Sequence, residues 1–130
     1  MKPGLRLAWA LSLWFAWSLE VAMLRIYDDV HTWARSMDSV LRSIARHDSN
    51  LSRQLRRAIT SVCLNVGEGM GACEGSKRQA NRVALKEMRE TASGLRLAAS
   101  WGYIARRSVE ETDLEGKITA TLIKLAKPGR

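Results

Sequence analysis

Arginine and lysine side chains recur at helical spacing in two stretches of this sequence, and their chemistry suits phosphate groups. Each guanidinium offers a planar fork of N–H donors that matches phosphate oxygens. The 130-residue chain has a formal net charge of +8, which favours a polyanionic partner. A solvated basic surface without such a partner is the alternative. The candidate nucleic-acid contacts are Arg53, Arg56, Arg57, Arg78, Arg82, Lys86 and Arg89.

No pattern in the sequence indicates catalysis. The glycine-rich residues 67–77 lack the spacing of a phosphate-binding loop and follow a helical pattern instead of a strand, so we predict a connection between helices. Glu68, Glu87 and Glu90 could meet inside a bundle, but the Glu-x-x-His pattern of di-metal bundles is missing. We therefore expect no enzyme, no cofactor and no metal. An enzyme with an unrecognised carboxylate site is the third and least favoured hypothesis.

The two cysteines, Cys63 and Cys73, show neither a disulfide framework nor a metal-binding spacing. Cys63 falls beside an apolar helical stripe, where a free thiol behaves as a small apolar side chain. We expect reduced thiols and a cytoplasmic protein.

Apolar residues recur every three or four positions in four segments, which is the spacing of amphipathic helices. We expect helices over about residues 24–47, 51–66, 76–104 and 108–127. Trp33 and Trp101 fit the buried sides and are interpreted as core. The four predicted buried stripes are Val30, Trp33, Ala34, Met37, Val40, Leu41 and Ile44; Leu51, Leu55, Ala58, Ile59, Val62 and Val66; Ala80, Ala84, Met88, Thr91, Leu95 and Ala98; and Leu114, Ile118, Leu122 and Leu125.

Polar residues and glycines mark the predicted helix ends. Residues 48–50 offer capping oxygens to the second helix. Ser76 with Gln79, and Ser108 with Glu111, match the capping box at the starts of the third and fourth helices. Four glycines are predicted to end the second helix and form the next connection: Gly67, Gly69, Gly71 and Gly75.

These elements predict an all-α fold, an antiparallel up-and-down four-helix bundle over residues 23–127, because short connections favour antiparallel neighbours. Residues 1–22 do not fit it: a basic start precedes thirteen uncharged residues, 7–19, with three tryptophans. An early assigned start with Met23 as the true initiator, a signal peptide and an anchor are the alternatives. We favour Met23, because an amphipathic helix begins soon after it, and we do not expect a membrane partner.

Three stretches, taken in order, carry a resemblance to a known family. They are LRIYDDVHTWARSM (residues 24–37), SRQLRRAITSVCLNVGEG (residues 52–69) and ALKEMRET followed by GLRLAASWGYI (residues 84–104). Together they resemble the four-helix-bundle proteins encoded by intervening sequences in bacterial 23S rRNA genes. The fit in the fourth helix is looser, and residues 1–22 match nothing in that family.

The resemblance implies a small bundle that assembles, typically as a homopentamer, and it does not imply an enzyme. Related bundles include the accessory protein of diversity-generating retroelements, which binds nucleic acid and a reverse transcriptase through a basic surface. The resemblance therefore implies nucleic acid and a reverse transcriptase as partners here. The residues that match the family signature are Asn65, Glu68 and Gly69, interpreted as structural residues that finish the second helix and bond to Glu90 or a neighbouring backbone group.

Two main hypotheses follow. The first is a non-enzymatic oligomer whose basic face binds RNA or DNA, in the role of an accessory to a reverse transcriptase. The second is a purely structural or protein-interaction scaffold with no nucleic-acid role. Under the second, apolar residues outside the main stripes, Leu64 and Leu85, would be subunit contacts.

Overall fold

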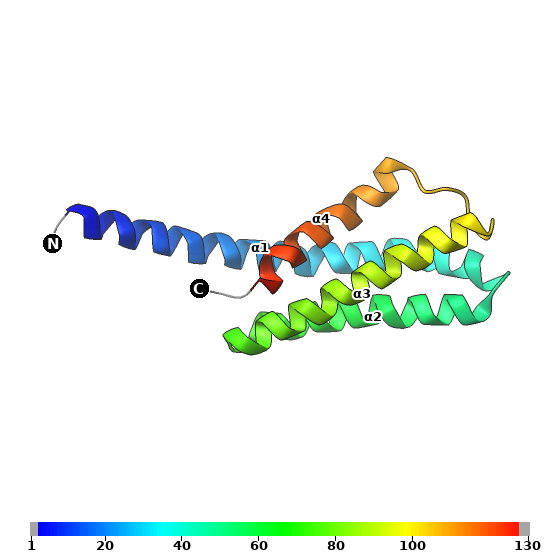
Figure 1. The fold of residues 1–130 in the computed structure, drawn as a ribbon, viewed down its shortest axis with the longest axis horizontal. Coiled ribbons are helices and arrows are strands. Elements are labelled where there is room, and N and C mark those ends of the chain that lie inside the picture. Colours follow the sequence, from blue (N-terminus) through cyan, green and yellow to red (C-terminus); the bar gives the residue numbers. More distant parts are fainter. Residues whose placement is uncertain (1–2, 128–130) are drawn as a thin grey trace.

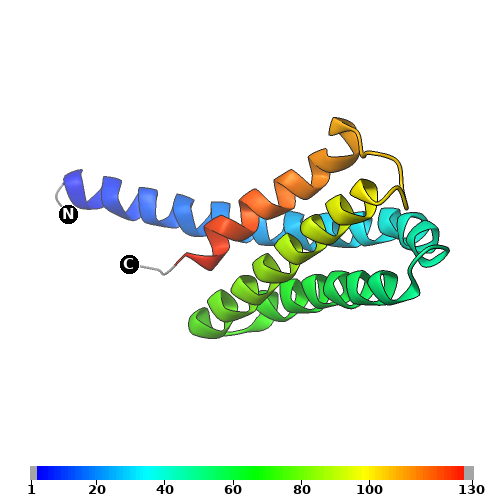
Figure 2. The ribbon, with the colours of Figure 1, turned by 45° about the vertical axis from the view of Figure 1, so that its right-hand side comes forward.

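The computed structural model describes residues 3–127, and within this range every regular element is an α-helix. The four helices are α1 (Pro3–Ala45), α2 (Ser49–Gly71), α3 (Glu74–Ser100) and α4 (Val109–Ala126). In Figures 1 and 2, α1 and α2 run alongside each other, and α3 and α4 are tilted relative to them. α2 packs along both α1 and α3, and α4 packs against α3 and α1. An all-helical fold with four helices is thus confirmed.

The apolar stripes of the four helices form one shared core. The least exposed side chains include Val30 and Trp33 on α1, Val62 on α2, Met88 on α3 and Ile118 on α4. All the predicted stripe residues of α2 and α3 are buried. On α1 and α4, Ala34, Val40, Leu114 and Leu125 are half-buried against that core. The periodicity therefore predicted the inward faces correctly.

Two of the predicted helix starts have the expected caps. The Asp48 carboxylate accepts a hydrogen bond from the backbone N–H of Leu51 at 2.9 Å. Ser108 and Glu111 form a complete capping box, in which each side chain accepts from the other residue's backbone N–H. Ser76 does not begin α3, because Cys73 occupies the N-cap and Ser76 and Gln79 lie inside the helix.

The glycine-rich segment is mostly helical, which corrects its prediction as a connection. α2 continues to Gly71, and only residues 72–73 separate it from α3. The final turns of α2 pack closely: a Cβ at Gly67 would lie 3.7 Å from Tyr27 Cε2, and one at Gly69 would lie 3.4 Å from Asn81 Oδ1. Packing against α1 and α3 offsets the helix-propensity cost of glycine, about 1 kcal/mol per residue.

α3 ends earlier than predicted, at Ser100 and not near Ile104. Gly102 adopts a left-handed backbone conformation with φ of 77°, which glycine tolerates without a Cβ clash. Its N–H donates to Ala99 O, and the N–H of Tyr103 donates to Ala98 O. The chain turns here, so Trp101 points outward and is 58% exposed. Its assignment to the core was wrong.

The packing of α2 on α3 depends on Gly94. A Cβ at this position would overlap Leu55 Cδ2, and Leu55 is itself buried. We expect Gly94→Ala to lower the free energy of unfolding by about 1 kcal/mol, because an overpacking cost of about 1–3 kcal/mol exceeds the gain in helix propensity. Urea denaturation of Gly94→Ala, Leu55→Ala and the double variant checks this. Leu55→Ala should cost less in the Gly94→Ala background, and strict additivity would show that the two residues do not clash.

Candidate nucleic-acid interface

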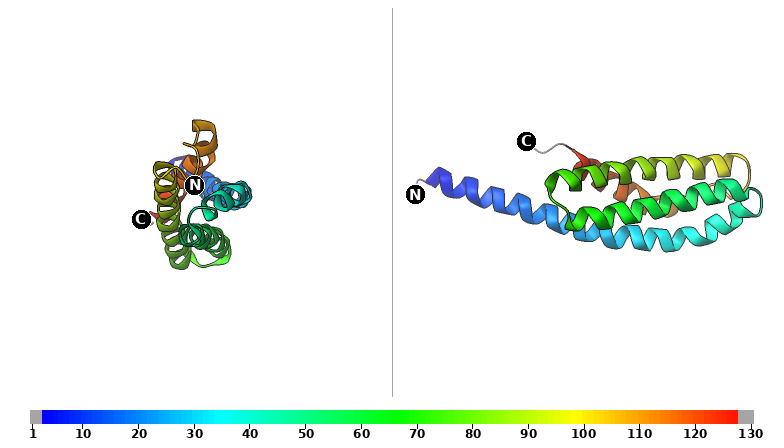
Figure 3. Two further views of the ribbon diagram at one scale, coloured as in Figure 1. Left: turned by 90° about the vertical axis from the view of Figure 1, so that its right-hand side faces the viewer. Right: turned by 90° about the horizontal axis from the view of Figure 1, so that it is seen from below.

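The charged side chains are distributed unevenly over the four helices. α2 carries three arginines and one glutamate, and α3 carries six lysines and arginines and three glutamates. α4 has the opposite balance, with two lysines and four carboxylates. Since α2 and α3 pack together, the positive charge gathers on one part of the molecule. We call it the α2–α3 surface, defined by the basic residues Arg53, Arg56, Arg57, Arg78, Arg82, Lys86 and Arg89. Figure 3 shows these two helices beside each other along the bundle.

The three arginines of α2 are all exposed, but they differ in their surroundings. Arg56 Nη2 lies 3.2 Å from Asp38 Oδ1 on α1, and Asp38 also pairs with Arg42. Arg53 and Arg57, with Asn50 and Gln54, line an open groove of about 310 Å³. Among residues 3–127, neither Arg53 nor Arg57 has an ion pair. Arg53 and Arg57 are therefore the α2 residues best placed to meet phosphates.

The basic residues of α3 also differ in whether they contact other parts of the protein. Arg82 Nε donates to the carbonyl oxygen of Ala126 at 3.3 Å, which ties α3 to the end of α4. Arg78 is half-buried. Lys86 and Arg89 are exposed and form no ion pair within the part of the chain that the structure describes. Of the seven candidates, Arg53, Arg57, Lys86 and Arg89 can thus bind a ligand without breaking an ion pair within residues 3–127.

Two glutamates interrupt the α2–α3 surface. Partial burial, followed by a hydrogen bond with Glu90 and repulsion from its charge, raises the pKa of Glu87 above its ordinary value. Lys86 and Arg57 oppose this shift, which places Glu87 in the field of both basic residues. Glu68 and Glu90 are exposed. No group of three His, Cys, Asp or Glu side chains within residues 3–127 is arranged to hold a metal ion.

The raised pKa of Glu87 predicts a pH-dependent stability. The folded state binds the Glu87 proton more tightly than the unfolded state, so stability falls as pH rises from 4.5 through the raised pKa, and the loss is complete above it. We expect Glu87→Gln to flatten this fall and to be at least as stable as the wild type at neutral pH. Urea denaturation of both proteins at several pH values between acidic and neutral measures the free energy of unfolding as a function of pH. Glu90→Gln should act in the same direction, and an unchanged profile in both variants would contradict the assignment.

The signature residues on α2 have structural environments. Asn65 Nδ2 donates to the backbone oxygen of Ser61 at 2.9 Å and lies 3.2 Å from its hydroxyl. This is the neighbouring-backbone bond that was predicted, whereas among the described residues Asn65 has no bond to Glu90. Gly69 is buried where α2 approaches Asn81 of α3. Asn65 lies inside α2, and Glu68 and Gly69 lie in its last turn, before the end at Gly71.

A buried polar network was not found by sequence reasoning. Trp33 Nε1 on α1 donates to Glu115 Oε1 on α4 at 3.0 Å, and Glu115 is 8% exposed. The same carboxylate oxygen pairs with Arg107, whose guanidinium also donates to Glu111 O at 3.1 Å. The network joins α1, α4 and the connection before α4. Glu115 precedes Ile118 by three positions and therefore lies on the apolar face of the predicted helix. This position is the signal in the sequence that could have identified Glu115 as buried.

An aromatic cluster lies beside the network, where residues 46–48 and 101–108 approach each other. The His47 and Tyr103 rings stack with centroids 5.1 Å apart, and Trp101 meets Tyr103 edge-on at 5.7 Å. A groove of about 720 Å³ includes His47, Tyr103, Arg46 and Arg106 in its lining. The cluster holds the two connections together, and it leaves Trp101 exposed.

The two cysteines are free thiols with different surroundings. Burial raises the pKa of the Cys63 thiol, which lies 3.6 Å from Val30 O. A hydrogen bond with the Ser76 hydroxyl lowers the pKa of the exposed Cys73 thiol. Cys73 is consequently the more readily ionised of the two.

Residues 23–124 match the model of the family described as 23S rRNA-intervening sequence protein. The chain belongs to this family. The family match begins inside α1 and reaches into α4, so all four helices of the intervening-sequence protein contribute to it. The resemblance inferred from the residues is therefore confirmed.

A solved structure shares the fold of this intervening-sequence protein. It is described as a protein with unknown function from the S23 ribosomal protein family of Bacteroides thetaiotaomicron. The two chains are 22% identical with a TM-score of 0.73, over 84% of this chain and 97% of that one. No curated protein matches the chain.

Proposed function

We propose that this intervening-sequence protein is a non-enzymatic RNA- or DNA-binding bundle that contacts phosphates through the α2–α3 surface. The observation that carries the proposal is the concentration of positive charge on α2 and α3, opposite in sign to the balance on α4. Arg53, Arg57, Lys86 and Arg89 form the centre of the proposed interface, because their charges are exposed and unpaired within residues 3–127.

The proposal includes an antiparallel up-and-down arrangement and a homo-oligomer, a pentamer by family resemblance. Contacts between α1 and α2 support the antiparallel order: Ser52 Oγ donates to Leu41 O at 2.8 Å, and further along α2 Cys63 contacts Val30, which is earlier in α1. Leu64, 67% exposed on α2, supports a subunit contact. Leu85 supports it less, because it packs partly against the core.

A cytoplasmic location and a reverse transcriptase as protein partner complete the proposal. The location rests on the two free cysteines, and the reverse transcriptase rests on the family resemblance. The α2–α3 surface would then contact nucleic acid while other faces contact protein. Nucleic-acid binding is the part that can be tested first.

A salt titration of RNA and DNA binding by the full chain tests the proposal, with the mass of the particle measured in the same buffers. We expect binding that weakens along a line of log affinity against log salt, with a slope of roughly −0.9 per phosphate contacted on duplex DNA and about −0.7 on single strands. Four contacts therefore give a slope of about −3 to −4. Absent or salt-insensitive binding would refute the proposal.

A structural scaffold without nucleic acid is the second candidate, and the exposed Leu64 is the observation that favours it. A well-formed oligomer that binds neither RNA nor DNA at low salt would select this candidate. The positive charge would then be a property of a soluble surface.

A further inference from the structure

The first half of α1 extends beyond the bundle as a single apolar helix. In Figures 1 and 3 it projects past the ends of α2, α3 and α4. From Leu5 to Trp17 its large apolar side chains are 55–65% exposed. These side chains are Leu5, Leu7, Trp9, Leu11, Leu13, Trp14, Phe15 and Trp17. Such a surface is much larger than the apolar patches that soluble monomers usually leave in water.

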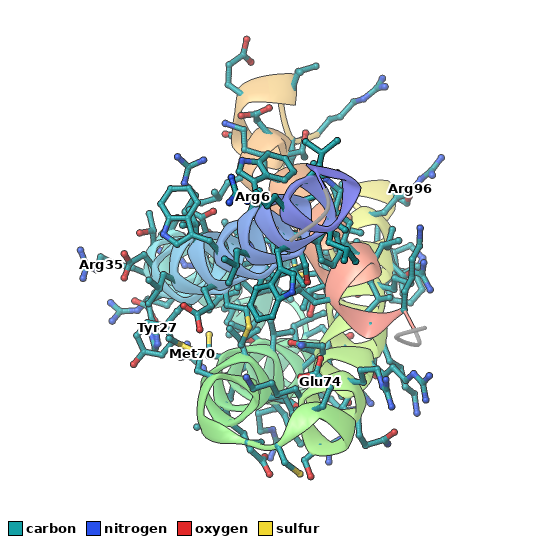
Figure 4. The ribbon with its side chains drawn as sticks, turned by 90° about the vertical axis from the view of Figure 1, so that its left-hand side faces the viewer. Arg6, Tyr27, Arg35, Met70, Glu74 and Arg96 are labelled. Atoms are coloured by element: carbon teal, nitrogen blue, oxygen red, sulfur yellow. The ribbon has the colours of Figure 1, made fainter. Side chains whose placement is uncertain are left out.

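The exposed apolar residues surround the helix and do not form a stripe. At about 100° per residue, Leu5, Trp9, Leu13 and Trp17 spread over one side and Leu7, Leu11 and Trp14 over the other. A partner helix needs only one apolar stripe, and a helix lying on a membrane surface keeps a polar face. A helix that is apolar all round requires an apolar medium on every side. Figure 4 looks along this helix from its exposed end, beside the labelled Arg6.

The length of the apolar segment suits the interior of a bilayer. Eighteen residues separate Arg6 from Arg25, and Glu20 is the only charged one among them. They span about 27 Å as a helix, close to the hydrocarbon thickness of about 30 Å. By length and composition the helix from Gly4 can cross a membrane, and burial in the core of a soluble protein does not explain its apolar segment.

We propose that the apolar segment of α1, residues 7–24, inserts into a phospholipid bilayer and tethers the bundle to it. Residues 18, 19 and 21–23 are half-buried, so the bundle packs against the last turns of this segment at the membrane surface. Arg6 and Arg25 lie at the two ends of the segment, where long basic side chains reach the headgroups. Glu20 lies close to the Arg25 end, toward the bundle. The helix continues without a break from this segment into Ile26 and Val30, which are buried in the core. The connection to the bundle is therefore rigid. A membrane-tethered protein differs from our expectation of Met23 as the initiator and of no membrane partner.

Flotation of the full chain with vesicles of pure phosphatidylcholine in high salt tests the proposal. These vesicles carry no net charge, and high salt screens attraction to the basic bundle. We expect the chain to float and to resist alkaline extraction. The double variant Leu11→Arg and Phe15→Arg should lose most of the floating fraction, because arginine at the centre of a membrane helix is strongly disfavoured.

The matched control adds the same two charges to exposed apolar residues of the bundle, as Leu97→Arg and Val109→Arg, and should float like the wild type. A second measurement needs no variant: brominated phosphatidylcholine should quench the fluorescence of Trp9, Trp14 and Trp17 in the inserted chain. A chain that stays in solution, floats only at low salt, or escapes quenching would overturn the proposal. So would an intact mass, after expression in cells, that shows removal of residues 1–22.

Discussion

Replacement of Glu115 by alanine is expected to lower the free energy of unfolding by about 3 kcal/mol, a large share of the 5–15 kcal/mol of a typical domain. The variant leaves Arg107, with 11% of its side chain exposed, without its carboxylate, and leaves Trp33 Nε1 without its acceptor. Breaking a buried pair costs about 3–5 kcal/mol. We place the loss at the lower end because the Arg107 side chain lies near the surface and can turn toward water.

Urea denaturation measures this loss, and two variants calibrate it. Glu110→Ala removes an exposed carboxylate from the same helix and should change stability by about 0.5 kcal/mol or less. Glu115→Gln keeps an oxygen acceptor for Trp33 but removes the charge that pairs with Arg107, so its loss should fall between those of Glu115→Ala and Glu110→Ala. Equal losses for Glu115→Ala and Glu110→Ala would show that the network does not hold α4 in place.

Reversal of two charges on the α2–α3 surface is expected to weaken nucleic-acid binding by roughly 100-fold at low salt. The variant is Arg53→Glu with Arg89→Glu, one residue from each helix. Each substitution removes one phosphate contact and adds repulsion, so the slope of log affinity against log salt should also become shallower by about two contacts. A filter-binding or anisotropy titration at several salt concentrations measures both quantities.

The control for this experiment is Arg25→Glu with Arg35→Glu, which makes the same change in net charge on α1. Both residues are exposed, and Arg35 points away from the bundle on the side opposite Arg96 of α3 (Figure 4). We expect a loss of a few-fold at most from the change in overall charge. Equal losses in the two double variants would mean that net charge, and not the α2–α3 surface, determines binding.

Local signals in the sequence predicted much of the bundle because their partners lie within a few positions. The Asp48 and Ser108 caps each bond to a backbone N–H three residues on, so a short motif contains the whole interaction. The apolar periodicity likewise identified Val62 and Met88 as core, since the helical repeat places them on one face.

The candidate interface was predicted only in part. Exposure of Arg53, Arg57, Lys86 and Arg89 follows from their positions opposite the apolar stripes. The contacts of Arg56 with Asp38, 18 positions away, and of Arg82 with Ala126, 44 positions away, depend on how helices meet. No spacing rule within one helix contains such a contact.

The sequence by itself determined the inward faces of the four helices, two of their caps and the family, but not that α1 begins at Pro3 instead of near residue 24. The tertiary structure decided where α2 ends, because packing of Gly67 and Gly69 against Tyr27 and Asn81 keeps glycines helical that local propensity would release. It also decided that Glu115 is buried, because Trp33, which donates to its carboxylate, lies 82 positions away. A pattern within one segment of the chain does not record such a contact.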